Sequence, residues 1–382
     1  MKVGISMKKN ILFMMINMNI GGTEKALLNM IDEIDNTKYN VTILMLEKYG
    51  GFLDYIPSWV NIKYIDEYKD LKPLYNNPPM KSAIKLIKQG KLTKGLTIGV
   101  SHLIYKITND RSIYFRYLLK ECKNIEEDYD VAIAYAGPMD LISYYIINKV
   151  KAEEKIQWVH FDVTKIGINK FFAEKLYSKF DKIYVVSAEA KNKLDNLIPS
   201  LASKTEVFHN IVPKNKIIKM AEEGQGFEDE FDGIRILTVG RLSHEKGQDM
   251  VIPIVSKLKL EGYPIRWYLI GDGNLRNECE KLIKKYNVED ECVLLGTKLN
   301  PYTYMKECDI YVQPSRYEGY CVTTMEVKVF EKYMVVTDVN GIKEQINNNK
   351  KGLIVDISED DIYENVKKII NNKILVNEAK CN

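Results

Sequence analysis

Residues 309–326 have the sequence DIYVQPSRYEGYCVTTME. The apolar run 309–312 predicts a short buried strand that the proline closes, and the glycine turn followed by two threonines predicts the start of a helix. Glu318 would then lie in the loop, and Glu326 about one turn into the helix. Carboxylates accept hydrogen bonds from hydroxyls, and the first N–H groups of a helix bind phosphate. This layout suits a ligand with sugar hydroxyls at both ends and an anion between them, although two glutamates at one spacing also recur by chance among 52 acidic residues.

The bulk composition is that of a soluble globular protein, with 46% hydrophobic and 28% charged residues. A length of 382 residues predicts two domains. The formal net charge of +3 gives no indication of a nucleic-acid partner, and no pattern indicates an oligomeric state. Six cysteines without a C-x-x-C spacing favour a reduced, cytoplasmic chain with no structural zinc. The first apolar stretch, 11–16, is too short for a signal peptide or a membrane span, so we expect a buried strand there.

Strand and helix patterns alternate along the chain, which predicts an α/β protein with two doubly wound, Rossmann-like parallel sheets. The expected strands are 11–16, 41–46, 61–65, 131–135, 155–160, 182–186, 234–239, 266–270, 293–295, 309–312, 334–337 and 352–355. The helix after the first strand should begin behind Thr23 as its N-cap. The alternation stops in the polar stretch 204–233, so we expect an N-terminal domain at 1–207 and a C-terminal domain at 208–382, facing each other across a cleft.

A second candidate motif, VGRLSHEKG at 239–247, follows the first strand expected in the C-terminal domain. Gly240 would permit a tight turn, and Arg241 and Lys246 would place two cations at the end of the strand. Two fixed cations bind a diphosphate and stabilise it as it leaves with extra negative charge. The alternative is a solvated loop with ordinary surface charges.

Three further patterns follow expected strands. NIGGT at 19–23 would bring a second substrate close to backbone N–H groups, or would simply be a tight turn. WVHFD at 158–162 offers His160 for a sugar hydroxyl and Asp162 for an acceptor, with a satisfied core histidine as the alternative. Gly271-Asp272-Gly273 is explained as a turn that lets a neighbouring loop or a ligand come close.

Residues 69–123 are strongly basic, with twelve Lys or Arg against three Asp or Glu, and apolar residues lie between the charges. A basic amphipathic helix of this kind is typical of an element that binds an anionic membrane surface. An insertion whose lysines are merely solvated is the equal alternative, and nucleic acid is a weaker third because no reader motif accompanies the charge.

Together, the Gly-Gly turn, Gly240-Arg241-(x)4-Lys246-Gly247 and Glu318-(x)7-Glu326 resemble glycosyltransferase family 4 over most of the chain. The family's members include bacterial capsular and cell-envelope polysaccharide glycosyltransferases. The resemblance implies a GT-B fold and a retaining, metal-independent sugar-nucleotide transferase. It also implies that no cofactor is needed besides the nucleotide-sugar donor.

The resemblance implies roles for residues around the donor. Arg241 and Lys246 would hold its diphosphate, Glu318 would bind the donor sugar, and Glu326 would bind the ribose hydroxyls. His160 would lie near the C6 hydroxyl of the sugar. These assignments make Arg241, Lys246, Glu318 and His160 the candidate catalytic residues.

A further set would surround the phosphates and the base. Gly22 would lie against the phosphate and the acceptor, and Thr323 and Thr324 would face the phosphates from the start of their helix. Thr297 and Lys298 would face the base.

Two departures from the family pattern stand out. The continuation Glu326-Val-Lys-Val-Phe-Glu331 lacks the glycine that ends this helix in the family, and its Lys328 is tolerable if it faces solvent. The chain stops soon after 369–370, so the family's long C-terminal helix, which crosses onto the first domain, looks shortened.

The expected reaction is transfer of a hexose, most simply from a UDP-sugar, to a hydroxyl of a lipid-linked saccharide or another envelope glycan. The enzyme would work in the cytoplasm, peripherally on the inner face of the membrane if residues 69–123 bind lipid. A UDP-sugar epimerase of the same fold and a non-catalytic nucleotide-sugar-binding subunit are the alternatives. Changing Lys246 to alanine is expected to abolish turnover with little effect on folding.

Overall fold

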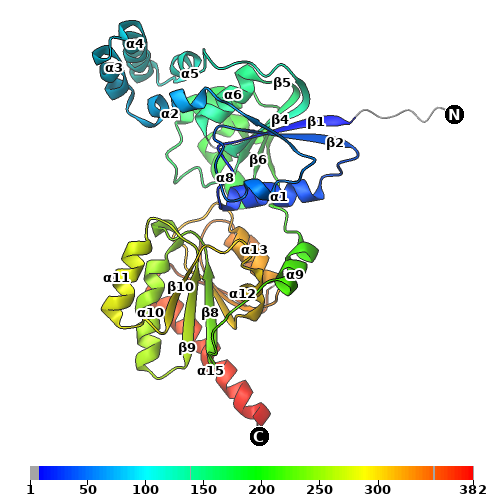
Figure 1. Ribbon diagram of the computed structural model, residues 1–382, viewed down its shortest axis with the longest axis vertical. Helices are drawn as coiled ribbons and strands as arrows, with labels where there is room; N and C mark the ends of the chain where they lie inside the picture. Colours follow the sequence, from blue (N-terminus) through cyan, green and yellow to red (C-terminus); the bar gives the residue numbers. More distant parts are fainter. Residues whose placement is uncertain (1–7, 138, 347–348, 382) are drawn as a thin grey trace, which may run out of the picture. The chain divides into compact units, whose positions relative to one another are not determined.

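The computed structural model describes residues 8–137, 139–346 and 349–381, with side chains described as far as Lys373. The chain divides into two compact units, Met1–His209 (unit 1) and Asn210–Asn382 (unit 2), each built around its own parallel sheet (Figure 1). No helix in the described part of the chain is long and apolar enough to span a bilayer.

Unit 1 contains a seven-stranded sheet in the order β3-β2-β1-β4-β5-β6-β7. The inner strand β1 pairs in parallel with β2 and with β4, and its residues 12–15 are all buried, as expected where helices cover both faces of a sheet. The strands are β1 (Lys9–Met15), β2 (Tyr39–Met45), β3 (Asn61–Tyr64), β4 (Asp128–Gly137), β5 (Lys151–Val159), β6 (Lys182–Val185) and β7 (Thr205–Val207).

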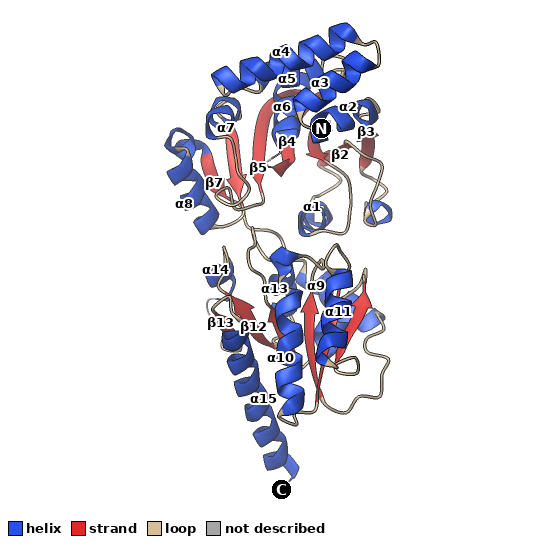
Figure 2. Ribbon diagram, turned by 90° about the vertical axis from the view of Figure 1, so that its left-hand side faces the viewer, coloured by secondary structure: helices blue, strands red, loops and turns tan. Residues whose placement is uncertain are grey.

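Some helices of unit 1 lie close to the sheet and others lie farther out. Figures 1 and 2 show α6 close to the sheet and α3 and α4 farther from it, so α3 and α4 form an extra layer on one side. The helices are α1 (Gly22–Glu33), α2 (Tyr68–Asn76), α3 (Pro79–Lys88), α4 (Leu92–Thr108), α5 (Ser112–Leu118), α6 (Asp140–Lys149), α7 (Lys170–Tyr177) and α8 (Ala188–Leu197), with short 3₁₀ turns η1 (Leu53–Tyr55) and η2 (Pro199–Lys204).

Unit 2 contains a six-stranded sheet in the order β10-β9-β8-β11-β12-β13, again parallel throughout. Its strands are β8 (Ile234–Val239), β9 (Ile265–Ile270), β10 (Cys292–Gly296), β11 (Ile310–Gln313), β12 (Tyr333–Thr337) and β13 (Gly352–Val355). Its helices are α9 (Lys214–Glu223), α10 (Gln248–Leu260), α11 (Arg276–Tyr286), α12 (Tyr302–Glu307), α13 (Val322–Lys328), α14 (Ile342–Ile346) and α15 (Glu359–Cys381), with η3 (His244–Lys246). One face of α15 packs on this core through Ile362, Val366 and Ile370.

All twelve expected strands are present, and the predicted α/β class with two doubly wound parallel sheets is confirmed. Two details were wrong. A thirteenth strand, β7, lies in the stretch where no strand was expected. Thr23 is not the N-cap of α1, because Gly21 takes the extended cap conformation and the helix already begins at Gly22.

Candidate functional site

The loops after β8 and β11 meet where the strand order of the unit 2 sheet reverses. β8 and β11 are neighbours, yet β9 and β10 continue on one side of them while β12 and β13 continue on the other. In open parallel sheets, ligands bind beyond the carboxyl ends of the strands at such a switch point. The segments 240–247 and 314–321 both follow strands at this point.

Glycine lets these two loops approach each other. Gly247 has a left-handed φ of 71°, and a Cβ added there would lie 2.0 Å from the carbonyl oxygen of Pro314. Gly271, with φ 139°, would likewise clash with Gly240 at 2.0 Å, which confirms the turn predicted at 271–273 as one that admits a neighbouring loop. Gly240, which was expected to permit a tight turn, has ordinary room for a side chain, since the atom nearest to an added Cβ would be 3.5 Å away.

Lys246 and Glu318 form a two-pronged ion pair at this point. Lys246 Nζ donates to Glu318 Oε1 at 2.6 Å and to Oε2 at 2.7 Å. The glutamate side chain is 7% exposed and the lysine 22%. Burial alone would lower the pKa of Lys246, but the charge and hydrogen bonds of Glu318 outweigh it, and the pKa is raised. The lysine therefore stays protonated at neutral pH. Its charge is paired with Glu318, although Lys246 was expected to bind the diphosphate of the donor and Glu318 the sugar.

A chain of buried hydrogen bonds holds Glu318 in place. Ser315 Oγ donates to Glu318 Oε1 at 2.7 Å, and Gln313 Nε2 donates to Ser315 Oγ at 2.9 Å. Gln313 Oε1 in turn accepts from Tyr311 Oη at 2.6 Å and from Thr323 Oγ1 at 3.2 Å. The carboxylate is therefore oriented by residues of β11 and of the first turn of α13.

Arg316 clamps the two loops together. Its guanidinium donates to both carboxylate oxygens of Asp249, at 2.8 and 2.6 Å, and to the carbonyl of His244 at 2.8 Å. Its backbone N–H donates to the carbonyl of Glu245 at 2.8 Å. Planar, two-pronged pairs of this kind fix orientation as well as distance, so the relative positions of Lys246 and Glu318 are set from outside the pair.

Arg241 lies in a different environment. Its side chain is 65% exposed and makes a long contact of 3.4 Å with Glu245. Exposed pairs of this kind contribute little to stability. The guanidinium is therefore available to an incoming anion at small energetic cost.

Glu326 is the fifth residue of α13, about one turn into the helix as predicted, and it is 3% exposed. Its Oε1 accepts a hydrogen bond from Tyr302 Oη of α12 at 2.7 Å. Thr324, beside it, is fully buried, and its Oγ1 has no hydrogen-bond partner within the described ranges. The pKa of Tyr311 is raised well above its ordinary value, first by burial and then by the charges of Cys321, Glu326 and Glu318.

Thr297 and Lys298 follow β10, at the edge of the same sheet. Thr297 is exposed, and Lys298 Nζ lies 5.7 Å from the ring centre of Tyr304 in α12. Because α12 also supplies the hydrogen bond to Glu326, it links these residues to the rest of the group.

The two predicted site residues of unit 1 have contrasting surroundings. Gly22 is exposed at the first position of α1. His160 is buried, stacked on Trp158 at 5.9 Å between ring centres and edge-on to Tyr135 at 4.5 Å. Burial lowers its pKa to about 3 despite a hydrogen bond to the backbone of Tyr135, so the ring is neutral, and its Nε2 has no partner in the part of the chain described.

Asp162 turns out to be a structural residue. Its Oδ1 accepts from Thr164 N and Oγ1, at 2.9 and 2.6 Å, and its Oδ2 accepts from Lys193 Nζ at 2.8 Å. These bonds close a turn and offset the burial of the carboxylate. The suggestion that Asp162 binds an acceptor finds no support here.

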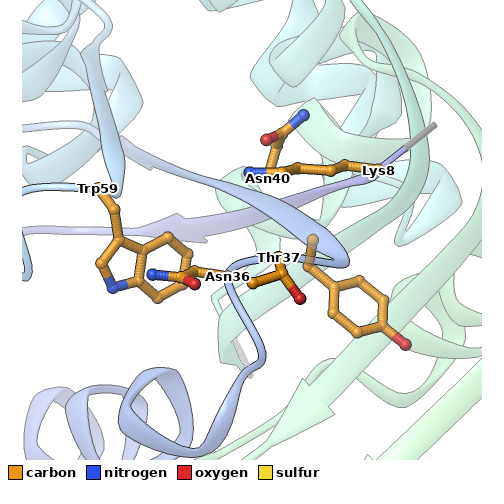
Figure 3. A pocket seen from close by; sticks show the side chains of 6 residues that line it. Lys8, Asn36, Thr37, Asn40 and Trp59 are labelled. Carbon is orange, nitrogen blue, oxygen red and sulfur yellow. The ribbon is translucent and has the colours of Figure 1, made fainter. Parts of the chain in front are cut away.

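A hollow of about 320 Å³ lies at the amino ends of β1 and β2 (Figure 3). Lys8, Asn36, Thr37, Asn40 and Trp59 line it, together with Tyr39. Gly22 follows the opposite, carboxyl end of β1, so this hollow is at the wrong edge of the sheet to belong to the predicted site.

The continuation of α13 departs from expectation at Lys328. Its Nζ donates to the carbonyl of Gln345 at 2.6 Å and the residue is half-buried, so it does not face solvent as the sequence comparison required. Glu331 stands in the place of the missing glycine and adopts a left-handed backbone conformation, with φ 53°.

Sequence analysis missed the residues that support the site: Tyr302, Tyr311, Gln313, Ser315 and the Arg316–Asp249 pair. One of them carried a signal. Gln313 is a long polar residue at the end of an apolar strand, and buried polar side chains are nearly always hydrogen-bonded. The others look like ordinary loop or core residues.

Residues 225–382 match the family described as glycosyl transferases group 1. A 208-residue segment is 29% identical to the N-acetylgalactosamine-N,N'-diacetylbacillosaminyl-diphospho-undecaprenol 4-alpha-N-acetylgalactosaminyltransferase of Campylobacter jejuni, covering 53% of this chain and 54% of that one. Protein CapJ of Staphylococcus aureus is 25% identical over 273 residues, 70% of this chain and 60% of CapJ. The matched segments thus span only about half of these relatives' length.

Solved structures extend the likeness over the whole chain. HepE of Anabaena in complex with UDP-glucose superposes with a TM-score of 0.67, at 16% identity, over 97% of this chain and 90% of that one. The switch-point residues Lys246, Glu318 and Glu326 all lie within the matched family segment. Residues 225–382 therefore match a group 1 glycosyltransferase domain, and the whole chain has a fold of the GT-B type.

Proposed function

We propose that the protein transfers a hexose from a nucleoside diphosphate sugar, most simply a UDP-sugar, to a hydroxyl acceptor with retention of configuration. The observation that carries this proposal is the buried Lys246–Glu318 pair at the switch point of the unit 2 sheet, inside the matched glycosyltransferase domain. A cation and a carboxylate held together in this way match a donor that joins a diphosphate to a polyhydroxylated ring.

In this proposal, Arg241 and Lys246 bind the diphosphate, Glu318 accepts hydrogen bonds from the donor sugar, and Glu326 accepts them from the ribose. The exposure of Arg241 and the burial of both glutamates support this division. Thr323 and Thr324 would contact the phosphates, and the unpartnered buried hydroxyl of Thr324 supports a polar neighbour there.

The remaining roles rest on single features. Thr297 and Lys298 would contact the base, since they follow β10, the outer strand of the same sheet. Gly22 would lie against the phosphate and the acceptor. His160 would bind a sugar hydroxyl through Nε2, the buried ring atom without a partner among described residues.

In the proposed reaction, the acceptor oxygen attacks the anomeric carbon on the face that the diphosphate leaves. The bond from that carbon to the phosphate oxygen breaks, and the acceptor proton passes to the departing diphosphate. Lys246 and Arg241 stabilise the negative charge that develops on it. No metal is assigned to this step, so activity is expected to persist in excess EDTA.

The acceptor proposed is a lipid-linked saccharide or another cell-envelope glycan. The name of the Campylobacter relative contains a diphospho-undecaprenol acceptor, and a Staphylococcus aureus relative is named as a poly(ribitol-phosphate) alpha-N-acetylglucosaminyltransferase. The five buried cysteines are free thiols, which favours a reducing compartment such as the cytoplasm.

The proposal is tested by incubating the protein with UDP-, GDP- and ADP-sugars, with and without a lipid-linked saccharide, in EDTA. We expect donor consumption only when acceptor is present, and an NMR coupling constant at the new linkage that shows the donor's configuration. Isomerisation of the donor without acceptor would instead identify an epimerase. Binding without any turnover, across acceptors, would identify a binding subunit.

The ion pair changes how Lys246 must be tested. Alanine at Lys246 would leave Glu318 buried and unpaired, at a cost of about 3 kcal/mol, so the effect on folding is no longer expected to be small. The double variant Lys246→Met/Glu318→Gln removes both charges together. We expect it to fold and to lose turnover about a hundredfold or more.

The matched control is Lys259→Met, which breaks an exposed lysine–glutamate pair with Glu291 in the same unit, away from the switch point. Its turnover should equal that of the unchanged protein. Equal turnover in the double variant and this control would overturn the proposed site.

A further inference from the structure

Helices α3 and α4 form a hairpin with an unusual charge composition. Residues 79–108 contain six lysines and no aspartate or glutamate, in a chain whose formal net charge is only +3. Lys94 forms an ion pair with Glu121, outside the hairpin, at 3.0 Å. The hairpin is therefore the most one-sided concentration of charge in unit 1 that the sequence offers.

The outer face of α4 is a continuous apolar stripe. Its members are spaced four, four, three and four residues apart, which places them on one side of a helix over about 24 Å. Each is between 54% and 84% exposed: Leu92, Leu96, Val100, Leu103 and Ile107. Scattered exposed leucines are ordinary, but a contiguous stripe of this length marks an interaction surface.

Helix α3 extends the surface and adds the charges. Met80, Ile84 and Ile87 are exposed at helical spacing. Lys81, Lys85 and Lys88 each follow one of them by one position, so an exposed lysine row runs beside the apolar row.

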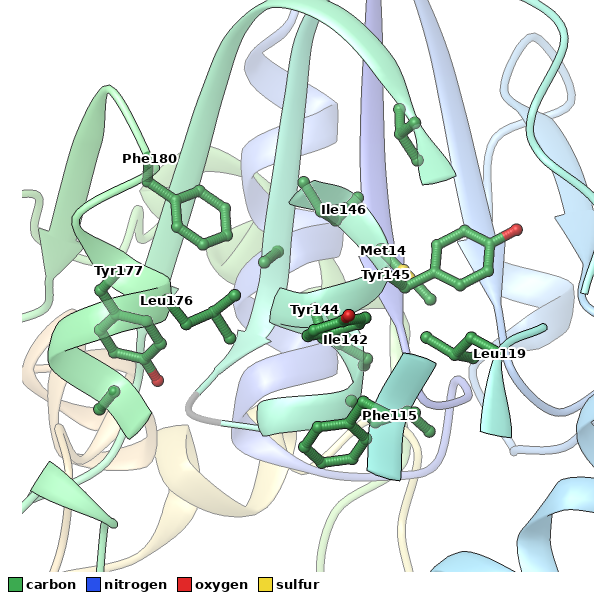
Figure 4. Packing of buried hydrophobic residues seen from close by; sticks show 14 of the residues in the cluster. Met14, Phe115, Leu119, Ile142, Tyr144, Tyr145, Ile146, Leu176, Tyr177 and Phe180 are labelled. Carbon is green, nitrogen blue, oxygen red and sulfur yellow. The ribbon is translucent and has the colours of Figure 1, made fainter. Parts of the chain in front are cut away.

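The opposite side of the hairpin is firmly packed, so the stripe is not the edge of a loose segment. A Cβ added to Gly95 of α4 would lie 2.6 Å from the side chain of Ile87 and 2.8 Å from the carbonyl of Ala83, which means that the two helices touch there. The following helix α5 buries Phe115, which lies beside Tyr144 (Figure 4), with 5.6 Å between the ring centres. The ring centre of Phe172 lies 5.5 Å from that of Phe115. Ala83 of α3 and Ile98 of α4 belong to the same buried cluster as Phe115, so the hairpin is attached to the core of unit 1 while its outer face is exposed in the described part of the chain.

We propose that the outer face of the α3–α4 hairpin docks on a membrane surface that contains anionic lipid. Apolar side chains in one stripe can enter the boundary between headgroups and acyl chains, and the lysine row beside them attracts anionic headgroups. A second copy of this chain fits the surface less well, because a symmetric contact would bring two lysine rows together. The proposal goes beyond glycosyl transfer and stands without it.

The test is flotation of the whole protein with vesicles of phosphatidylcholine alone or with 30% phosphatidylglycerol. We expect the protein to float with the anionic vesicles. At about 0.5 M salt, flotation should be weaker because the attraction of the lysines to the headgroups is screened, but it should persist because the apolar contacts remain. Leu96→Glu/Leu103→Glu should lower the partition coefficient at least about tenfold at both salt concentrations. Lys81→Glu/Lys85→Glu/Lys88→Glu should lower it strongly at low salt only.

The matched control is Leu260→Glu, because Leu260 is as exposed as Ile107, at 84%, but ends a helix of unit 2. It should float as the unchanged protein does. Absence of flotation with anionic vesicles would overturn the proposal. Equal flotation of the hairpin variants and the control would also overturn it. The same holds if a hairpin variant leaves flotation unchanged and alters only the oligomeric mass measured by light scattering.

Discussion

Lys246 and Glu318 satisfy each other before any ligand is present, and this limits what each can do. A diphosphate that reaches Lys246 competes with a carboxylate already bonded through both oxygens. Arg241, which is exposed and weakly paired, is the cation that an incoming anion meets at lower cost. We infer that Arg241 contributes more to capture of the donor and Lys246 more to stabilising the departing diphosphate.

Ser315 is the residue whose loss should loosen Glu318 without touching its charge. In Ser315→Ala, Glu318 loses one hydrogen bond and Gln313 Nε2 loses its acceptor in a fully buried position. We expect urea unfolding to show a loss of about 1–3 kcal/mol and the donor KM to rise. Thr303→Val is the control, since that buried hydroxyl has no partner within the described ranges and its removal breaks no bond. Equal losses in both variants would contradict the orienting role.

His160 should make unit 1 sensitive to acid. Burial lowers its pKa from 6.5 to about 3, so between these values the unfolded chain binds a proton that the folded chain does not. The stabilisation is complete above about pH 6.5 and is lost as the pH falls toward 3, by about 1.4 kcal/mol for each pH unit. Urea unfolding at pH 7 and at pH 5 measures this effect. Between these pH values, the free energy of unfolding of His160→Asn should fall by about 2 kcal/mol less than that of the unchanged protein. Parallel pH profiles would show that the imidazole is not desolvated.

At the scale of elements, the backbone that follows α13 is strained at Glu331. Glu331 stands where the related family has glycine, and it adopts φ 53°, a conformation that costs a residue with a Cβ about 1–2 kcal/mol. Glu331→Gly should therefore raise the free energy of unfolding by about 1 kcal/mol, because the backbone bonds of residue 331 do not involve the side chain. Asn287→Gly, at φ 51°, should gain less, since asparagine tolerates this region. A gain no larger than that control's would rule out strain at Glu331.

Most elements could be predicted because buried parallel strands are short apolar runs between polar segments. β7 was not predicted because its three residues include a single apolar side chain, Val207, and a charged one, Glu206. The cap of α1 was misplaced because a glycine in extended conformation caps a helix without a side-chain bond, which leaves no polar signal. The ion pair joins residues 72 positions apart, and only the strand order that places β8 beside β11 brings them together.

At the scale of the whole molecule, the two units have separate hydrophobic cores. One cluster is built from residues of unit 1 only, and two more from residues of unit 2 only. Predicted donor contacts divide unequally between them, since eight of the ten predicted site residues belong to unit 2. Stability gained from donor binding should therefore be concentrated in unit 2.

Hydrogen exchange of the full chain with and without UDP tests this. At UDP a hundredfold above its Kd, the slowest amides of β8 and β11 should gain about a hundredfold in protection, equivalent to about 2.7 kcal/mol, because ligand binding to the folded state stabilises it by mass action. The slowest amides of β1 and β4 should change far less, since their core lies in the other unit. The Lys246→Met/Glu318→Gln variant should show no such protection at the same UDP concentration. Protection confined to β1 and β4 would move the nucleotide site to unit 1 and contradict the assignment made from the switch point.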